Sequence, residues 1–265
     1  MQTIFYRITL YAVVVLLLGV VLQAYSGDAF YVNLDGVLQP PSAHTGLLGT
    51  DELGRDVLAR LLIGAKISLV VGLSVVVVTG ILGTSIGFLS GYFGGMVDHI
   101  IMRITDIFLA FPGILLAIAF AALMGPGVEN VIFALCLMGW VGFARLARAQ
   151  ALSLRHMAYV EASQISGMGV GHILLKHILP NAAAPLIVEA VFAMAGAMIA
   201  EAGLSFLGLG VQPPNPSLGA MLREGARYMP VAPHLVLAPG LLLMALVLGL
   251  NIIGDNLRDK LDARL

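Results

Sequence analysis

Two long stretches of this chain, residues 67–89 and 235–253, contain no charged side chain. A helix needs about 20 mostly apolar residues to cross the hydrocarbon core of a bilayer, so each stretch is long enough to span one. The apolar runs are continuous and do not alternate with polar residues as the strands of a membrane β-barrel do. The hydropathy pattern predicts an all-α, polytopic membrane protein with six spanning helices, at residues 8–23, 67–89, 104–124, 128–144, 186–204 and 235–253.

The composition agrees with a chain that lies in a bilayer. Only 11% of its 265 residues are charged and 59% are hydrophobic, whereas soluble domains contain roughly 25% charged residues. The net charge of −1 and the lack of a basic run exclude a typical nucleic-acid-binding domain. The single cysteine, Cys136, excludes a disulfide framework within the chain and a thiolate metal site.

The orientation follows from the distribution of lysine and arginine. If the N-terminus is cytoplasmic, nine of the 14 basic residues lie inside and five lie outside. Because basic residues concentrate on the cytoplasmic side, this distribution favours two cytoplasmic termini. Segment 8–23, with Ala24-Tyr25-Ser26 behind it, also resembles a secretory signal. Only Arg7 precedes it as a basic residue, which favours a retained helix.

Four glycines in and after the second predicted helix follow one another at intervals of four residues: Gly83, Gly87, Gly91 and Gly95. Small residues at this interval share one face of a helix and allow a second backbone to approach closely. They predict a helix-packing face. Pro112 and Pro239 fall inside predicted spans, where kinks are expected.

Three acidic residues lie in or near predicted spans: Asp106, Glu189 and Glu201. One interpretation is an ion-coupled relay of a secondary transporter, because charges at this depth are costly and often functional. The other is that they cap helices or pair with loop residues, and we prefer it. The six histidines form no HExxH or i, i+4 zinc pair, so no metal site is expected. A membrane hydrolase is the weaker alternative, since no nucleophile–base set or phosphate-binding loop is found.

The inner loop predicted at residues 145–185 is the most informative stretch. Basic residues at its start are followed by EASQISG at 161–167 and by HILPN at 177–181. We expect a helix, a turn at Gly167 and a second helix that ends at Pro180.

This loop resembles the EAA signature of permease subunits of bacterial binding-protein-dependent ABC importers. The signature has EAA, three residues, Gly, nine residues and then I-x-L-P. Glu161, Ala162, Gly167, Leu179 and Pro180 match it, whereas Ser163 replaces an Ala and His177 replaces an Ile. With His177, the stretch around it resembles the corresponding stretch of the dipeptide, oligopeptide and nickel branch of these permeases. Further stretches resemble that branch's "C" permeases in order along the chain, at residues 48–58, 91–95, 102–112, 201–210 and 254–262.

The resemblance implies a type I ABC importer transmembrane fold with a core at residues 67–255. An N-terminal anchor and extracytoplasmic segment (1–66) would precede the core, and a cytoplasmic tail (256–265) would follow it. The loop at 145–185 would couple to an ATPase, with Glu161, Ala162, Ser163, Gly167, His177, Leu179 and Pro180 as the coupling positions.

The expected partners are a homologous permease in a heterodimer, two cytoplasmic ATP-binding subunits, an extracytoplasmic solute-binding protein and membrane lipid, with no nucleic acid. The expected location is the bacterial cytoplasmic (inner) membrane. The chain itself would bind no cofactor and would not be an enzyme, because ATP would be hydrolysed by the partner subunits. Small peptides are the first expected cargo, and nickel or a nickel chelate is the second.

Overall fold

A computed structural model describes residues 29–42 and 46–262, which form helices and connecting segments without a β-strand. The predicted first helix at 8–23 lies outside the described residues. The elements are η1 (Leu34–Gly36), α2 (Val57–Phe93), α3 (Gly95–Ala110), α4 (Gly113–Met124), α5 (Val128–Leu154), α6 (Ala158–Ile165), α7 (Val170–Ile173), η2 (Leu174–Ile178), α8 (Leu179–Phe206), α9 (Leu218–Ala226) and α10 (His234–Asp262).

Four helical segments of the described chain are long and apolar enough to cross a membrane: α2, α5, the run Val170–Phe206 and α10. The segment predicted at 104–124 differs from the expected single span. It is a pair, α3 and α4, bent by 80°. Phe111 is extended, with φ −98° and ψ 140°, because the residue before a proline disfavours the helical region. The predicted kink at Pro112 is therefore a break between two helices, and the first of them begins as early as Gly95.

The glycine face of α2 lies against α5. A β-carbon on Gly83, Gly87 or Gly91 would stand closer than 3.0 Å to backbone atoms of α5. The two helices therefore approach to a distance that only glycine permits, as is common for helix pairs in lipid. Gly95 does not belong to this contact. It begins α3, has φ +53°, and a β-carbon there would meet no atom within 4 Å.

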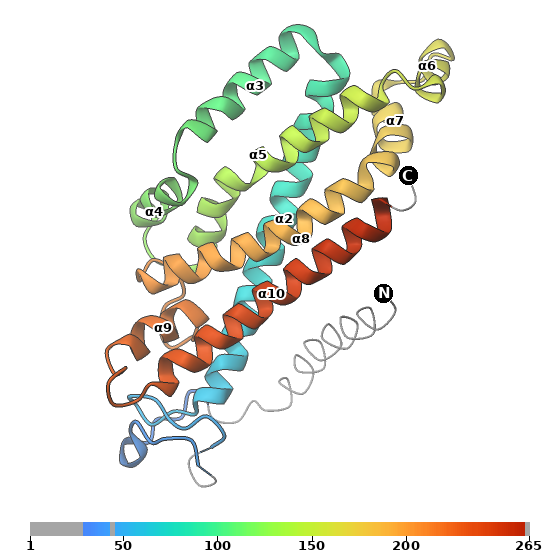
Figure 1. The fold of residues 1–265 in the computed structure, drawn as a ribbon. Coiled ribbons are helices and arrows are strands. Elements are labelled where there is room, and N and C mark those ends of the chain that lie inside the picture. The colour runs from blue at the N-terminus through green and yellow to red at the C-terminus, as the bar shows by residue number, and fades with distance from the viewer. Residues whose placement is uncertain (1–28, 43–45, 263–265) are drawn as a thin grey trace.

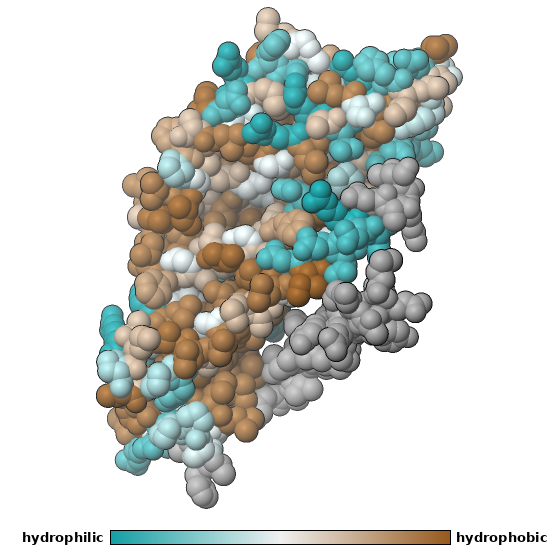
Figure 2. Space-filling model, in the orientation of Figure 1, coloured by the Kyte–Doolittle hydropathy of each residue, from teal (hydrophilic) through white to brown (hydrophobic). Residues whose placement is uncertain are grey.

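The bundle has two distinct ends (Figure 1). At one end lie α6, α7 and the turn between α2 and α3, and we call this the elbow end. At the other end lie α9 and the segments 29–42 and 46–56. Hydrophilic side chains gather at both ends of the visible face, and hydrophobic side chains dominate the zone between them (Figure 2). This arrangement is expected of a protein whose middle contacts lipid.

Polar contacts of Asp98 at the elbow end fix the start of α3 to the bundle. Thr105 is the one buried residue of α3. Near the start of α3, Asp98 accepts hydrogen bonds from Arg148 Nη2 at 2.7 Å and from Ser90 Oγ at 2.5 Å. These contacts join α3 to α5 and to the end of α2, so charge rather than apolar packing holds this end of α3.

Candidate functional site

The elbow, which we define as α6, α7 and η2 (residues 158–178), is narrower than the predicted inner loop. Helix α5 continues to Leu154, so residues 145–154 belong to it. The run Val170–Phe206 is one continuous helical segment that includes α7, η2 and α8. The non-helical part of the predicted loop is thus reduced to short connections on either side of α6.

A double hydrogen bond closes the C-terminus of α6 at Gly167. The N–H of Met168 donates to Ser163 O at 3.1 Å, and the N–H of Gly167 donates to Gln164 O at 3.0 Å. This Schellman pattern requires a left-handed residue, and Gly167 has φ +74°. A β-carbon on Gly167 would meet no atom within 4 Å. The glycine is therefore needed for its backbone conformation and not for space.

Pro180 does not end a helix, contrary to the sequence prediction. It lies in the first turn of α8, and the helical path continues through it. A proline donates no N–H and its ring collides with the carbonyl four residues earlier. The five residues of η2 just before Leu179 form a π-helix, whose wider turn accommodates this defect without breaking the segment.

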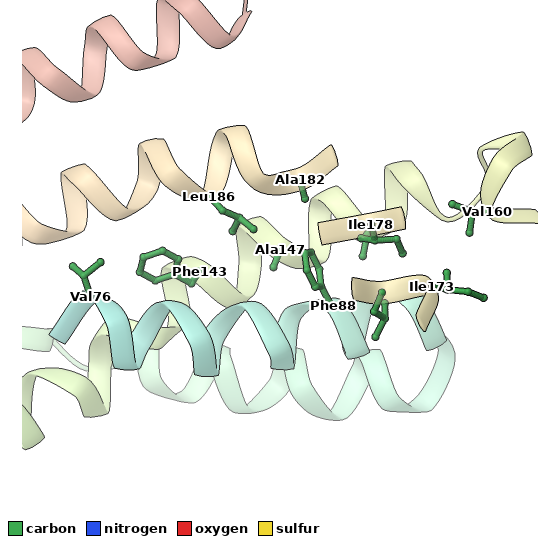
Figure 3. Close-up of a cluster of buried hydrophobic side chains, with 11 residues drawn as sticks. Val76, Phe88, Phe143, Ala147, Val160, Ile173, Ile178, Ala182 and Leu186 are labelled. Carbon is green, nitrogen blue, oxygen red and sulfur yellow. The ribbon is translucent and has the colours of Figure 1, made fainter. Parts of the chain in front are cut away.

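The elbow has a buried face and an exposed face. Val160, Ile173 and Ile178 are buried to 1% exposure or less and point into an apolar cluster between α2, α5 and α8 (Figure 3). On the other side, Ile165 is 87% exposed and Leu175 is 68% exposed. The elbow is thus anchored to the bundle through one face and presents apolar side chains beyond the bundle on the other.

The other predicted coupling residues divide between these faces. Glu161 and Ala162 are exposed on α6. Ser163 is buried, and its Oγ lies 3.2 Å from Nε2 of His177 in η2. The structure therefore brings together the two residues that differ from the EAA pattern, although they are 14 positions apart.

A cleft of about 290 Å³ opens between α2, α4, α5 and α8. None of the described residues that form its wall is charged. The hydroxyl proton of Thr79 in this wall is not available to a ligand, because it is donated to Val75 O at 2.7 Å. The residues that α2 and α8 contribute are Val75, Thr79, Ala193, Gly196, Ala197 and Ala200.

The three intramembrane acids do not converge. Asp106 is exposed on α3 and Glu189 is half-buried on α8. Glu201 is fully buried and accepts hydrogen bonds from Ser68 Oγ and Ser205 Oγ, both at 2.7 Å. Within the described ranges, no three His, Cys, Asp or Glu side chains form a group that could hold a metal ion. Glu201 joins α8 to α2, so its contacts are structural, but it neither caps a helix nor pairs with a loop residue as expected.

An ion-pair network at the opposite end was not predicted. Arg60 at the start of α2 is 3% exposed, and its Nη2 donates to Glu224 Oε2 of α9 at 2.9 Å. Its Nε lies 3.3 Å from Asp51 Oδ2, an ion pair without hydrogen-bond geometry. Arg55 Nε donates to the same Asp51 oxygen at 2.7 Å. Burial raises the pKa of the Glu224 carboxyl, and Arg60 opposes this rise. The network fixes the segment before α2 and helix α9 to one another.

Comparison with known proteins places these features in a family. The sequence profile described as "Binding-protein-dependent transport system inner membrane component" matches residues 83–265. The chain is 46% identical over 226 residues to the glutathione transport system permease protein GsiD of Pectobacterium atrosepticum, covering 85% of this chain and 74% of that protein. It is 45% identical over 233 residues to the dipeptide transport system permease protein DppC of Alkalihalophilus pseudofirmus, covering 88% and 76%.

The fold is also similar to a solved structure. An inward-facing form of the MetNI methionine ABC transporter superposes with a TM-score of 0.59 at 21% identity, covering 76% of this chain and 95% of that chain. The expected fold class, an all-α bundle of the type I importer kind, is confirmed. Together with the elbow, the matched profile and the two relatives show that the chain belongs to the family of binding-protein-dependent transport system inner membrane components.

Proposed function

We propose that this permease forms one half of an ATP-driven import pathway and receives the force for transport at its elbow. Membership of the family implies partner subunits that hydrolyse ATP and a protein that delivers the substrate. The observation that carries the proposal is the elbow itself. Its inner face is packed into the bundle, whereas Ile165 and Leu175 project outward at the end of the bundle, as a docking surface requires.

In this proposal, the exposed side of α6 with Glu161 and Ala162 contacts an ATPase subunit. Gly167 sets the angle between α6 and α7, and His177, Leu179 and Pro180 continue into α8. When two ATPase subunits close on ATP, α6 moves with them, and the movement passes through α7 and η2 into α8, which continues them without a break. Because α8 lines the cleft, this movement changes access to the cleft from one side of the membrane to the other.

We further propose that the elbow end faces the cytoplasm, with both termini on the same side. The larger share of basic residues expected there favours this orientation. Residues 67–255 would form the core, and a homologous permease would cover its open side as the other half of a heterodimer. Two ATPase subunits and one extracytoplasmic binding protein would complete the importer.

Small peptides are the cargo that we propose. Relatives at 46% and 45% identity carry the names of glutathione and dipeptide permeases. The uncharged wall of the cleft suits the passage of short peptides without a strong binding site. We expect the complete complex in proteoliposomes to import labelled alanyl-alanine when ATP is supplied. Accumulation of radioactive nickel without peptide uptake would contradict the assignment, as would uptake that ignores ATP and follows a proton gradient.

Cross-linking tests the docking surface directly. In a Cys136→Ala background, Ile165→Cys is labelled with a thiol-reactive benzophenone in the assembled complex and then illuminated. We expect an adduct between this chain and the ATPase subunit, because the side chain at 165 is 87% exposed on the elbow. Val231→Cys is the matched control, since position 231 is 74% exposed near the opposite end and should give no ATPase adduct. ATPase adducts from Val231→Cys alone would place the docking surface at the end opposite the elbow and would refute the proposal.

A further inference from the structure

One hydrogen bond inside the elbow joins α6 to η2. These two elements form the two arms of the elbow, one before and one after the Gly167 turn. Ser163 is 6% exposed in the last turns of α6, and its Oγ lies 3.2 Å from His177 Nε2 in η2. The rings of His172 and Tyr159 flank His177, each with its centroid 6.1 Å away. The contact therefore lies between the two arms and not on the exposed surface of the elbow.

The Ser163 hydroxyl has one proton but two hydrogen-bond partners, and this determines which group donates to which. Ser163 Oγ donates its single proton to Tyr159 O at 2.8 Å, one turn earlier in α6. The oxygen can then only accept from the imidazole, so His177 must carry a proton on Nε2. Both the neutral Nε2–H tautomer and the imidazolium satisfy this requirement.

The position of His177 gives the bond a mechanical consequence. Residues of η2 pass without interruption into α8, and α8 contributes Gly196 and Ala200 to the wall of the cleft. Helix α6, on the other side of the bond, has eight residues and ends at the Gly167 turn. A displacement of α6 can thus reach α8 by two routes. One runs along the backbone through the Gly167 turn, and the other crosses the Ser163–His177 bond and the apolar contacts beneath it.

We propose that Ser163 is a positioning residue that transmits the movement of α6 to α8 by accepting the Nε2 proton of His177. The inference rests on the proposed function, because it assumes that α6 is moved by an ATPase. It assigns to the two residues that differ from the EAA pattern a shared role in coupling, separate from the docking surface.

Accessibility of the cleft tests the proposal without knowledge of the cargo. In a Cys136→Ala background, Ala200→Cys reports from the cleft wall of α8. The labelling rate with a water-soluble maleimide is measured in the complete complex, with and without ATP plus vanadate. We expect Ser163→Ala to reduce the ATP-dependent ratio of labelling rates about fivefold, which corresponds to the ~1 kcal/mol of one hydrogen bond. Ser163→Thr, which keeps the hydroxyl, should restore the ratio.

Two further measurements separate a loss of coupling from a loss of folding. His172→Gln changes the neighbouring imidazole, for which no hydrogen bond to Ser163 is found, and should leave the ratio unchanged. In a sample labelled with 15N-histidine, one Nε2–H signal should shift in Ser163→Ala and return in Ser163→Thr. Copurification of the ATPase and its basal activity should be the same in all variants.

The outcomes distinguish this inference from the function on which it rests. If the Ala200→Cys reporter in the parent background shows no response to ATP, the proposed function itself fails. If the parent responds and Ser163→Ala responds equally, transmission through Ser163 is refuted while the importer function stands. The same conclusion follows if Ser163→Thr is as defective as Ser163→Ala.

Discussion

The Gly167→Val substitution is expected to abolish most ATP-driven transport while the chain still inserts and assembles. Residue 167 has φ +74°, a conformation that is costly for any residue with a β-carbon and most costly for a β-branched one. Valine would open the two hydrogen bonds that close α6 and would change the direction in which the elbow projects. We expect transport per ATP hydrolysed to fall about tenfold or more, because the cost of ~1–2 kcal/mol adds to the loss of docking geometry.

A graded series at this position separates conformation from size. Asparagine tolerates the left-handed region better than alanine, so coupling should decrease in the order Gly, Asn, Ala, Val. Gly171 supplies the matched control, because it also lies in the elbow, has open space around it and does not have positive φ. Gly171→Ala should retain coupling. Equal defects at 167 and 171 would show that the elbow tolerates no added side chain, and the conformational explanation would be wrong.

The turn at Gly167 was predictable because its cause is local. A glycine after a short amphipathic stretch marks a helix C-terminus, and the spacing of the EAA pattern added its position. The length of the helices around it was not predictable in the same way. The basic side chains of residues 145–154 led to the prediction of a loop there, but a helix can extend past the apolar part of a span as readily as a loop can begin, and α5 continues to Leu154. Pro180 likewise predicted the end of a helix, but the π-helical turn before it allows the helix to continue.

The break between α3 and α4 escaped prediction for a related reason. Hydropathy averages over about 20 residues and does not register a single extended residue such as Phe111. Gly95 was assigned to the glycine face because the spacing of four persists after the helix itself has ended at Phe93. Periodicity describes a face only as long as one helix continues.

Contacts between distant residues could not be predicted at all. Arg60 and Glu224 are 164 positions apart, and the resemblance at 48–58 marked one side of their network without naming the other. Ser163 and His177 each stood out as differences from a pattern, yet their contact depends on how η2 returns to α6. For both pairs the missing information was the fold, which the hydropathy of the single sequence describes only as a set of spans.

The Gly87→Leu substitution is expected to have the largest effect on stability. A β-carbon at this position would stand closer than 3.0 Å to Ala144 O and 2.8 Å from Ala147 Cβ. Because the first of these atoms belongs to the backbone of α5, no side-chain rotation relieves the collision. Helices α2 and α5 must separate, and the close contact through which Gly83 and Gly91 also pack is lost along its length.

We expect Gly87→Leu to lower the free energy of unfolding by about 3 kcal/mol or more, as severe overpacking does. Gly87→Ala should show a smaller loss in the same direction, since even one methyl group collides. Gly249 of α10 is the matched control, because it is also helical and a β-carbon there meets no atom within 4 Å. Thermal unfolding of each purified variant in detergent, followed by loss of the monodisperse peak in size-exclusion chromatography, measures these differences. If Gly249→Ala destabilises the protein as much as Gly87→Ala, glycine content in general would matter and the close α2–α5 contact would not explain the effect.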